Sequence, residues 1–139
     1  PDTGVFGKLA LALDLEPNRT SLMLDSLRAM LSATGASPEI VLVHGVSPLS
    51  AEEAPAMLNA AEEALEEIRD EIASWGLEVS TSLLAGDPAT DLPGRIEEIA
   101  PSSLAVGLPA AGELGRLVLG SVAEALLEST RCPLVVFPL

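Results

Sequence analysis

Five short runs of apolar residues recur along the chain, and segments with helical periodicity separate them. Four of the runs consist largely of Val, Ile, Leu and Ala, which is typical of parallel strands buried on both faces. The third run alternates apolar and polar residues, which indicates a half-exposed strand. The pattern predicts strands over residues 8–15, 39–44, 77–84, 103–107 and 134–139.

Between the strands, apolar residues at spacings of three and four mark one face of each segment. The expected helices cover residues 19–33, about 54–75, 92–100 and 121–130. Asn18 or Thr20 is expected to cap the first helix. Asp87 and Pro88 can open the third, but Pro93 is expected to interrupt it, so only its later part is predicted to be regular.

Strands and helices therefore alternate along the whole chain, from one strand at the start to another at the end. This order predicts an α/β fold, an open five-stranded parallel sheet with helices on both faces, Rossmann-like in arrangement. The 139 residues are expected to form a single domain, 1–139. Ligands of such sheets bind at the carboxyl ends of the strands, which here lie near Asp14, His44 to Gly45, and Gly107.

Charge and composition narrow the function classes. The chain has 7 basic and 21 acidic side chains and a net charge of −14, which disfavours binding to nucleic acid. Its longest uncharged stretch, residues 99–112, is shorter than the ~20 residues of a spanning helix, so no direct membrane insertion is expected. A single cysteine and the lack of a signal-peptide pattern predict a cytoplasmic location.

The segment GLPAAGELGRLVLGS, from Gly107 to Ser121, follows a predicted strand and leads into a predicted helix. Glycine lets the backbone approach a ligand closely, and the amides at a helix start suit a phosphate group. The segment contains neither the Walker pattern nor the dinucleotide fingerprint. On residue types alone, a connection without a ligand remains the alternative.

Several stretches together resemble the universal stress protein family over nearly the whole chain. They are FGKLALALD at the start, EIVLVHGV in the second strand, GDPA at 86–89, SLAVG at 103–107 and LGSVAEALLESTRCPLVVF at 119–137. The resemblance implies a five-stranded α/β fold and, in one branch of the family, binding of ATP. It also implies a homodimer that pairs through the last strand, formed here by Leu134, Val135, Val136 and Phe137.

The resemblance also implies which residues bind the nucleotide. Gly107, Gly120 and Ser121 match the glycine motif of the ATP-binding branch, whereas Ala110 stands where that motif has its second glycine. Asp14 matches an acid that contacts ribose and base. Gly45 and Val46 match the strand end whose backbone holds adenine, and the neighbouring residues Leu13, Val106 and Val122 complete the predicted site.

Three further side chains have simple structural interpretations. His44 has no second histidine or cysteine beside it, so a packed, hydrogen-bonded imidazole is expected. Cys132 is expected to be a small buried hydrophobic residue. Glu16 follows Asp14 closely, where its charge can repel phosphate groups.

The first functional hypothesis is a stress-response regulatory domain that dimerises and binds an adenine nucleotide, ATP with or without Mg²⁺. The alternative is a dimerisation or interaction module of the same fold that binds no nucleotide, including as the soluble domain of a larger protein such as a transporter. Ala110, Glu16 and the net charge favour this alternative. A third hypothesis, an adenylating enzyme, lacks the phosphate-handling motifs it needs, and fast ATP hydrolysis is not expected without a general base.

Overall fold

The computed structural model describes residues 7–108 and 121–139, in which strands and helices alternate as the sequence predicts. The elements are β1 (Lys8–Ala12), α1 (Pro17–Thr34), β2 (Glu39–Val46), α2 (Ala54–Ala73), β3 (Val79–Ala85), α3 (Pro88–Ile99), β4 (Ser103–Leu108), α4 (Ser121–Ser129) and β5 (Leu134–Pro138).

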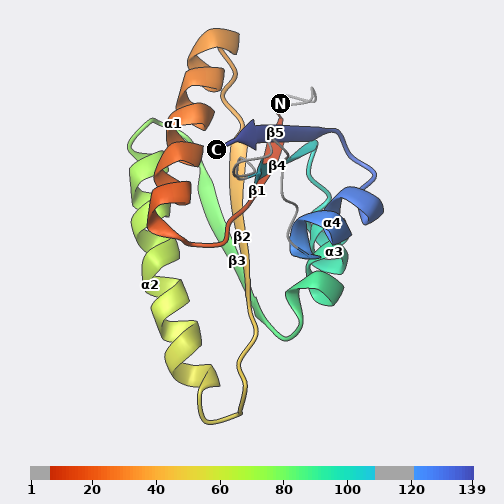
Figure 1. The fold of residues 1–139 in the computed structure, drawn as a ribbon. Helices are drawn as coiled ribbons and strands as arrows, with labels where there is room; N and C mark the ends of the chain where they lie inside the picture. The colour runs from red at the N-terminus through yellow and green to blue at the C-terminus, as the bar shows by residue number, and fades with distance from the viewer. Residues whose placement is uncertain (1–6, 109–120) are drawn as a thin grey trace, which may run out of the picture.

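The strands form one parallel sheet in the order β3-β2-β1-β4-β5. Helices α1 and α2 cover one face of this sheet, and α3 and α4 cover the other (Figure 1). The predicted α/β fold, an open five-stranded parallel sheet with helices on both faces, is confirmed.

The core follows from the alternation of side chains along each strand. Leu9 and Leu11 of β1 point toward α1 and α2, whereas Ala10 between them points toward α3 and α4. All three side chains are fully buried. Because β1 lies in the middle of the sheet, both of its faces are covered, which explains the continuous apolar run in its sequence.

The first predicted strand ends earlier than expected, and the helix after it has a different cap. β1 ends at Ala12, and the backbone at Leu15 is left-handed, with φ of 63°, which ends the extended chain. Helix α1 begins at Pro17 and is capped by Glu16, whose carboxylate accepts hydrogen bonds from the amides of Asn18 (3.2 Å) and Arg19 (2.7 Å). The prediction of Asn18 or Thr20 as the cap is wrong, because the longer side chain of Glu16 reaches the free amides first.

The third helix is longer than predicted. α3 starts at Pro88 and continues through Pro93. The side chain of Asp87 caps it, accepting hydrogen bonds from the amide of Ala89 (3.3 Å) and the hydroxyl of Thr90 (2.8 Å). Pro93 removes one backbone hydrogen bond, but burial of Leu92 and Ile96 holds the helix against the sheet.

None of the helices in residues 7–108 and 121–139 is long and apolar enough to cross a membrane. In the same residues no group of three or more His, Cys, Asp or Glu side chains is placed to hold a metal ion.

Candidate functional site

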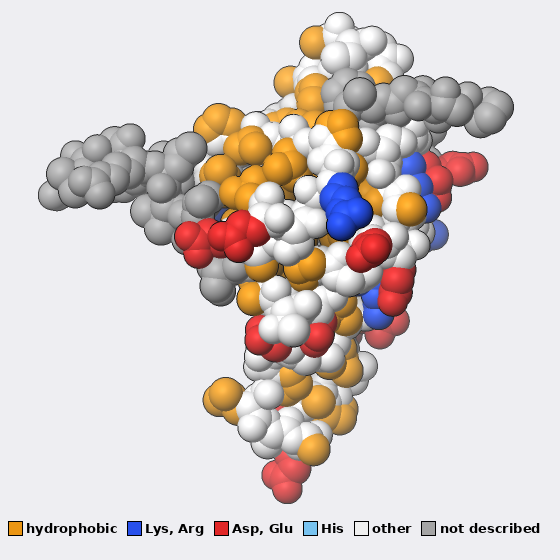
Figure 2. All heavy atoms as spheres, turned by 90° about the vertical axis from the view of Figure 1, so that its right-hand side faces the viewer, with side chains coloured by type: hydrophobic (Ala, Val, Ile, Leu, Met, Phe, Trp, Pro, Cys, Tyr) orange, Lys and Arg blue, Asp and Glu red, His pale blue; other side chains and the backbone are white. Residues whose placement is uncertain are grey.

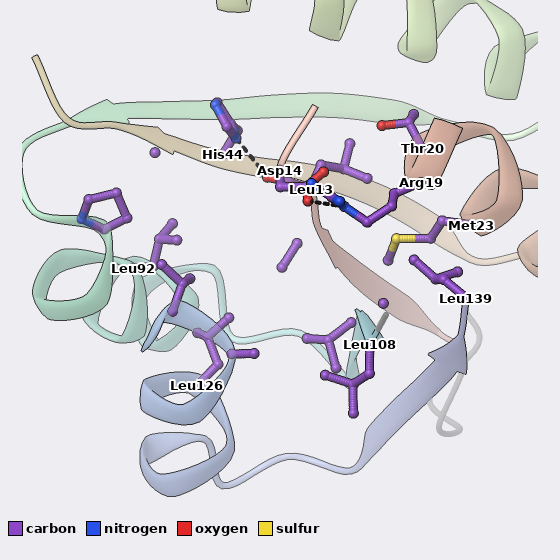
Figure 3. A pocket seen from close by; sticks show the side chains of 17 residues that line it. Leu13, Asp14, Arg19, Thr20, Met23, His44, Leu92, Leu108, Leu126 and Leu139 are labelled. Atoms are coloured by element: carbon purple, nitrogen blue, oxygen red, sulfur yellow. Dashed lines mark hydrogen bonds and ion pairs between the residues drawn. The ribbon is translucent and has the colours of Figure 1, made fainter. Parts of the chain in front are cut away.

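A cavity of about 420 Å³ lies at the carboxyl ends of β1, β2 and β4 (Figure 3). The chain leaves β1 toward β2 on one side of the sheet and returns to β4 on the other side, so β1 and β4 flank the point at which the strand order reverses. A reversal of this kind leaves a crevice at the carboxyl edge of the sheet, where open α/β domains bind ligands.

The walls of the cavity are mainly apolar, and they come from the sheet, from three helices and from the last residue. The described lining residues are Ala12, Leu13, Asp14, Arg19, Thr20, Met23, His44, Gly45, Pro88, Leu92, Val106, Gly107, Leu108, Val122, Ala123, Leu126 and Leu139. A mostly apolar wall with a few polar groups on one side is typical of sites for small organic ligands.

Two glycines bring backbone directly to the wall of the cavity. A Cβ atom on Gly45 would lie 3.1 Å from the ring carbons of Pro88, at the start of α3. A Cβ atom on Gly107 would lie 2.7 Å from Cδ1 of Leu139 and 3.4 Å from the sulfur of Met23. Both positions therefore use the missing side chain to allow close packing.

Asp14 and Arg19 form the charged part of the cavity wall. The Oδ1 atom of Asp14 accepts a hydrogen bond from the amide of Glu16 (2.9 Å), and Oδ2 accepts one from Nε of Arg19 (2.7 Å). The hydrogen bond with Asp14 raises the pKa of Arg19. The side chains of Arg19 and Asp14 are 43% and 54% exposed, so solvent screens the ion pair and it adds little to the stability of the fold.

His44 is hydrogen-bonded, as expected. Its Nδ1 atom lies 2.6 Å from the carbonyl oxygen of Leu13 (Figure 3). Because a carbonyl oxygen only accepts, the proton of this hydrogen bond belongs to Nδ1. The bond ties the end of β2 to the segment that leads into Asp14.

Six of the predicted site residues line the same cavity: Leu13, Asp14, Gly45, Val106, Gly107 and Val122. Val46 is buried and is not among the lining residues. Ala110 and Gly120 lie outside the described residues, as does the rest of the glycine segment that joins β4 to α4. Ser121 begins α4.

Sequence reasoning did not place Arg19 and Leu139 in the site, nor the helix residues Met23, Leu92 and Leu126. The helical periodicity marks the last three only as buried, and nothing in that pattern distinguishes a core position from the wall of a cavity. The position of Arg19 beside the cavity depends on where the first turn of α1 begins, and the Glu16 cap determines that start.

Cys132 lies outside this cavity and packs against the core on the α3 and α4 side. It is partly exposed, not fully buried as expected. Burial raises the pKa of its thiol above the ordinary value of 9.0, so the reactive thiolate is disfavoured near neutral pH.

Together, the strand order and the cavity at its reversal define an open, doubly wound α/β domain with a candidate small-molecule site. The model of the universal stress protein family matches residues 6–138, so this chain belongs to the universal stress protein family.

A universal stress protein of Methanocaldococcus jannaschii is 31% identical over 75 residues, which are 54% of this chain and 44% of that protein. The chain therefore spans less than half the length of this relative. A solved universal stress protein from Archaeoglobus fulgidus has a TM-score of 0.74 and 20% identity, covering 94% of this chain and 98% of that one.

Two similar structures contain a nucleotide. A universal stress protein from Archaeoglobus fulgidus in complex with dAMP has a TM-score of 0.66 and 18% identity, covering 95% of this chain and 98% of that one. A family member from Arabidopsis thaliana with AMP bound also has a TM-score of 0.66 and 15% identity, covering 95% of this chain and 91% of that one. At these identities the likeness establishes the fold alone.

Proposed function

We propose that this chain is a regulatory domain that binds an adenine nucleotide in the cavity at the carboxyl ends of β1, β2 and β4. The observation that carries the proposal is the convergence of Asp14, Gly45 and Gly107, from three different strand ends, on one cavity. The nucleotides bound by the Archaeoglobus and Arabidopsis proteins support the choice of adenine.

The lining residues suit such a ligand. A cavity of about 420 Å³ falls within the range of small-ligand sites, roughly 300–1,000 Å³. The apolar side chains of Leu92, Val122 and Leu126 offer a surface against which a purine can pack. Asp14 is a carboxylate that can accept hydrogen bonds from ribose hydroxyls, and its two existing bonds leave further lone pairs free.

The ATP form of the proposal assigns the phosphates to Gly107, Gly120 and Ser121. Amides at the start of α4 would bind phosphate oxygens, and a divalent ion such as Mg²⁺ would offset the remaining charge. Ala110, at a motif glycine position, makes the monophosphate the better candidate than the triphosphate.

We also propose that the protein is a homodimer that pairs through β5. This strand lies at one edge of the sheet, and Val136 is 41% exposed. Hydrophobic side chains gather in the upper part of the face of the molecule on the α3, α4 and β5 side (Figure 2). An exposed edge strand with apolar side chains is a template for pairing with a second chain.

The second candidate function is a dimerisation module, in the cytoplasm or within a larger protein, that binds no nucleotide. One observation favours it: Leu139 packs against Gly107 so closely that it takes up part of the space beside this strand end.

Isothermal titration calorimetry of the purified protein with AMP tests the choice between these functions. Saturable binding with one site per chain supports the nucleotide function. A dimer that gives no binding heat at about 10 mM AMP, a concentration above the Kd of even a millimolar site, supports the second function and refutes the first.

A further inference from the structure

The charged groups of the cavity point to a property that the family resemblance does not assign. Among the described lining residues, Arg19 is the only Lys or Arg and Asp14 is the only Asp or Glu. Because the whole chain carries a net charge of −14, an anionic ligand is repelled over most of the surface. Any attraction from a basic side chain of the described cavity wall must therefore come from Arg19.

The geometry of Arg19 suits an anion. Its Nε atom donates to Asp14 at 2.7 Å and lies 3.9 Å from a carboxylate oxygen of Glu16. The two terminal nitrogens of the guanidinium bond to no acceptor within residues 7–108 and 121–139. Figure 3 shows the side chain of Arg19 reaching from α1 toward Asp14.

Asp14 determines how the charge of the cavity wall changes when the Arg19 cation is removed. Paired with Arg19, the carboxylate contributes little net charge to the wall of the cavity. Without Arg19 it would present an uncompensated negative charge to an incoming phosphate. The Arg19 cation therefore neutralises the charge of Asp14. Its terminal N–H groups form a planar fork that matches phosphate oxygens, and they remain free to donate hydrogen bonds.

We propose that Arg19 is the specificity-determining residue of the cavity and makes it select the charged nucleoside monophosphate over the uncharged nucleoside. The inference rests on the proposed adenine-nucleotide function. It assigns a role to a side chain on α1, outside the glycine segment between β4 and α4.

The test compares AMP with adenosine by calorimetry at one fixed ionic strength. The wild-type protein binds AMP more tightly than adenosine. Arg19→Met lowers AMP affinity about tenfold, as expected for a half-exposed charge-assisted contact, and changes adenosine affinity less than twofold. Arg19→Lys, which keeps the charge but not the fork, restores part of the AMP affinity.

Two matched variants complete the design. Arg69→Met removes the same charge from the exposed surface of α2 and leaves both affinities unchanged, because within the described part of the chain Arg69 forms ion pairs only with its helix neighbours Glu66 and Asp70. The double variant Asp14→Asn, Arg19→Met removes the repulsion and recovers part of the AMP affinity relative to Arg19→Met alone.

If Arg19 had a purely structural role, Arg19→Met would weaken the binding of AMP and of adenosine by the same factor. That result overturns the inference and leaves the nucleotide function intact. If the ratio of AMP affinity to adenosine affinity is the same in Arg19→Met as in the wild type, the inference is likewise overturned and the nucleotide function stands. A wild-type protein that binds neither compound overturns both the inference and the proposed function.

Discussion

Gly45 at the end of β2 packs against Pro88 at the start of α3 so closely that a Cβ atom would lie 3.1 Å from two carbons of the proline ring. The contact places the start of α3 over the end of β2, and both residues line the cavity. Because the proline ring is rigid, neither side of this contact can yield easily.

Gly45→Ala is therefore expected to destabilise the fold by about 1–3 kcal/mol, the usual effect of overpacking. Thermal unfolding followed by circular dichroism measures the change. Gly94→Ala is the matched control, because Gly94 lies exposed in α3 and a Cβ atom added there would have no neighbouring atom within 4 Å. It should gain about 0.5–1 kcal/mol from better helix propensity. An unchanged melting temperature for Gly45→Ala would contradict the close packing.

Two threonine hydroxyls are buried without a hydrogen-bond partner in the described part of the chain, those of Thr20 and Thr130. A buried hydroxyl without a partner is destabilising, and valine has the same shape without the polar group. We expect Thr20→Val and Thr130→Val each to stabilise the protein by about 1 kcal/mol in urea unfolding.

Thr34→Val is the control for these variants. The hydroxyl of Thr34 donates to the carbonyl of Met30 at 2.9 Å, so its removal gives no such gain. If Thr20→Val and Thr130→Val were no more stable than Thr34→Val, the two hydroxyls would have partners in solution.

The thiol of Cys132 provides a pH-dependent prediction. Burial raises its pKa in the folded protein above the 9.0 of a free thiol. The folded state therefore holds this proton more tightly than the unfolded state, and stability from this group is present below pH 9 and lost as pH rises through the folded-state value. Alkylation by iodoacetamide should reach half its maximal rate at a higher pH in buffer than in urea. Since the chain has one cysteine, the signal is specific, and coincident pH profiles would refute the shift.

The proposed dimer predicts different effects at the two edges of the sheet. Val136→Lys places a charge on the exposed side of β5 and should convert the dimer to a monomer in analytical ultracentrifugation. Thr81→Lys, at an exposed position of the opposite edge strand β3, should leave the dimer unchanged. Two results would contradict pairing through β5. One is a wild-type protein that is monomeric at about 0.1 μM, which is 100 times the Kd of a dimer with nanomolar affinity. The other is a Val136→Lys variant that remains a dimer.

The fold could be predicted because each central strand is a continuous apolar run and each helix has an apolar stripe. Leu9 and Leu11 illustrate this, since burial on both faces of the sheet leaves a direct mark on the sequence. The ends of elements were harder to predict. Glu16 caps α1 through a longer side chain than the usual capping residues have, and Pro93 is tolerated in α3 because Leu92 and Ile96 are buried beside it.

The strand ends of the site could be predicted from the family motifs, as Asp14, Gly45 and Gly107 illustrate. The ion pair between Asp14 and Arg19 could not, because it depends on the left-handed turn at Leu15 and on the first turn of α1. Leu139 could not be placed either, since its contact with Gly107 is formed by residues more than thirty positions apart.

A titration of the ¹⁵N-labelled protein with AMP, followed by amide chemical shifts, tests the central claim most directly. The account predicts saturable shift changes concentrated at Asp14, Gly45 and Gly107, with the amides of the exposed face of α2 unaffected. No shift change at about 10 mM AMP, far above the dissociation constant of a specific nucleotide site, or changes confined to residues outside the cavity, would contradict it.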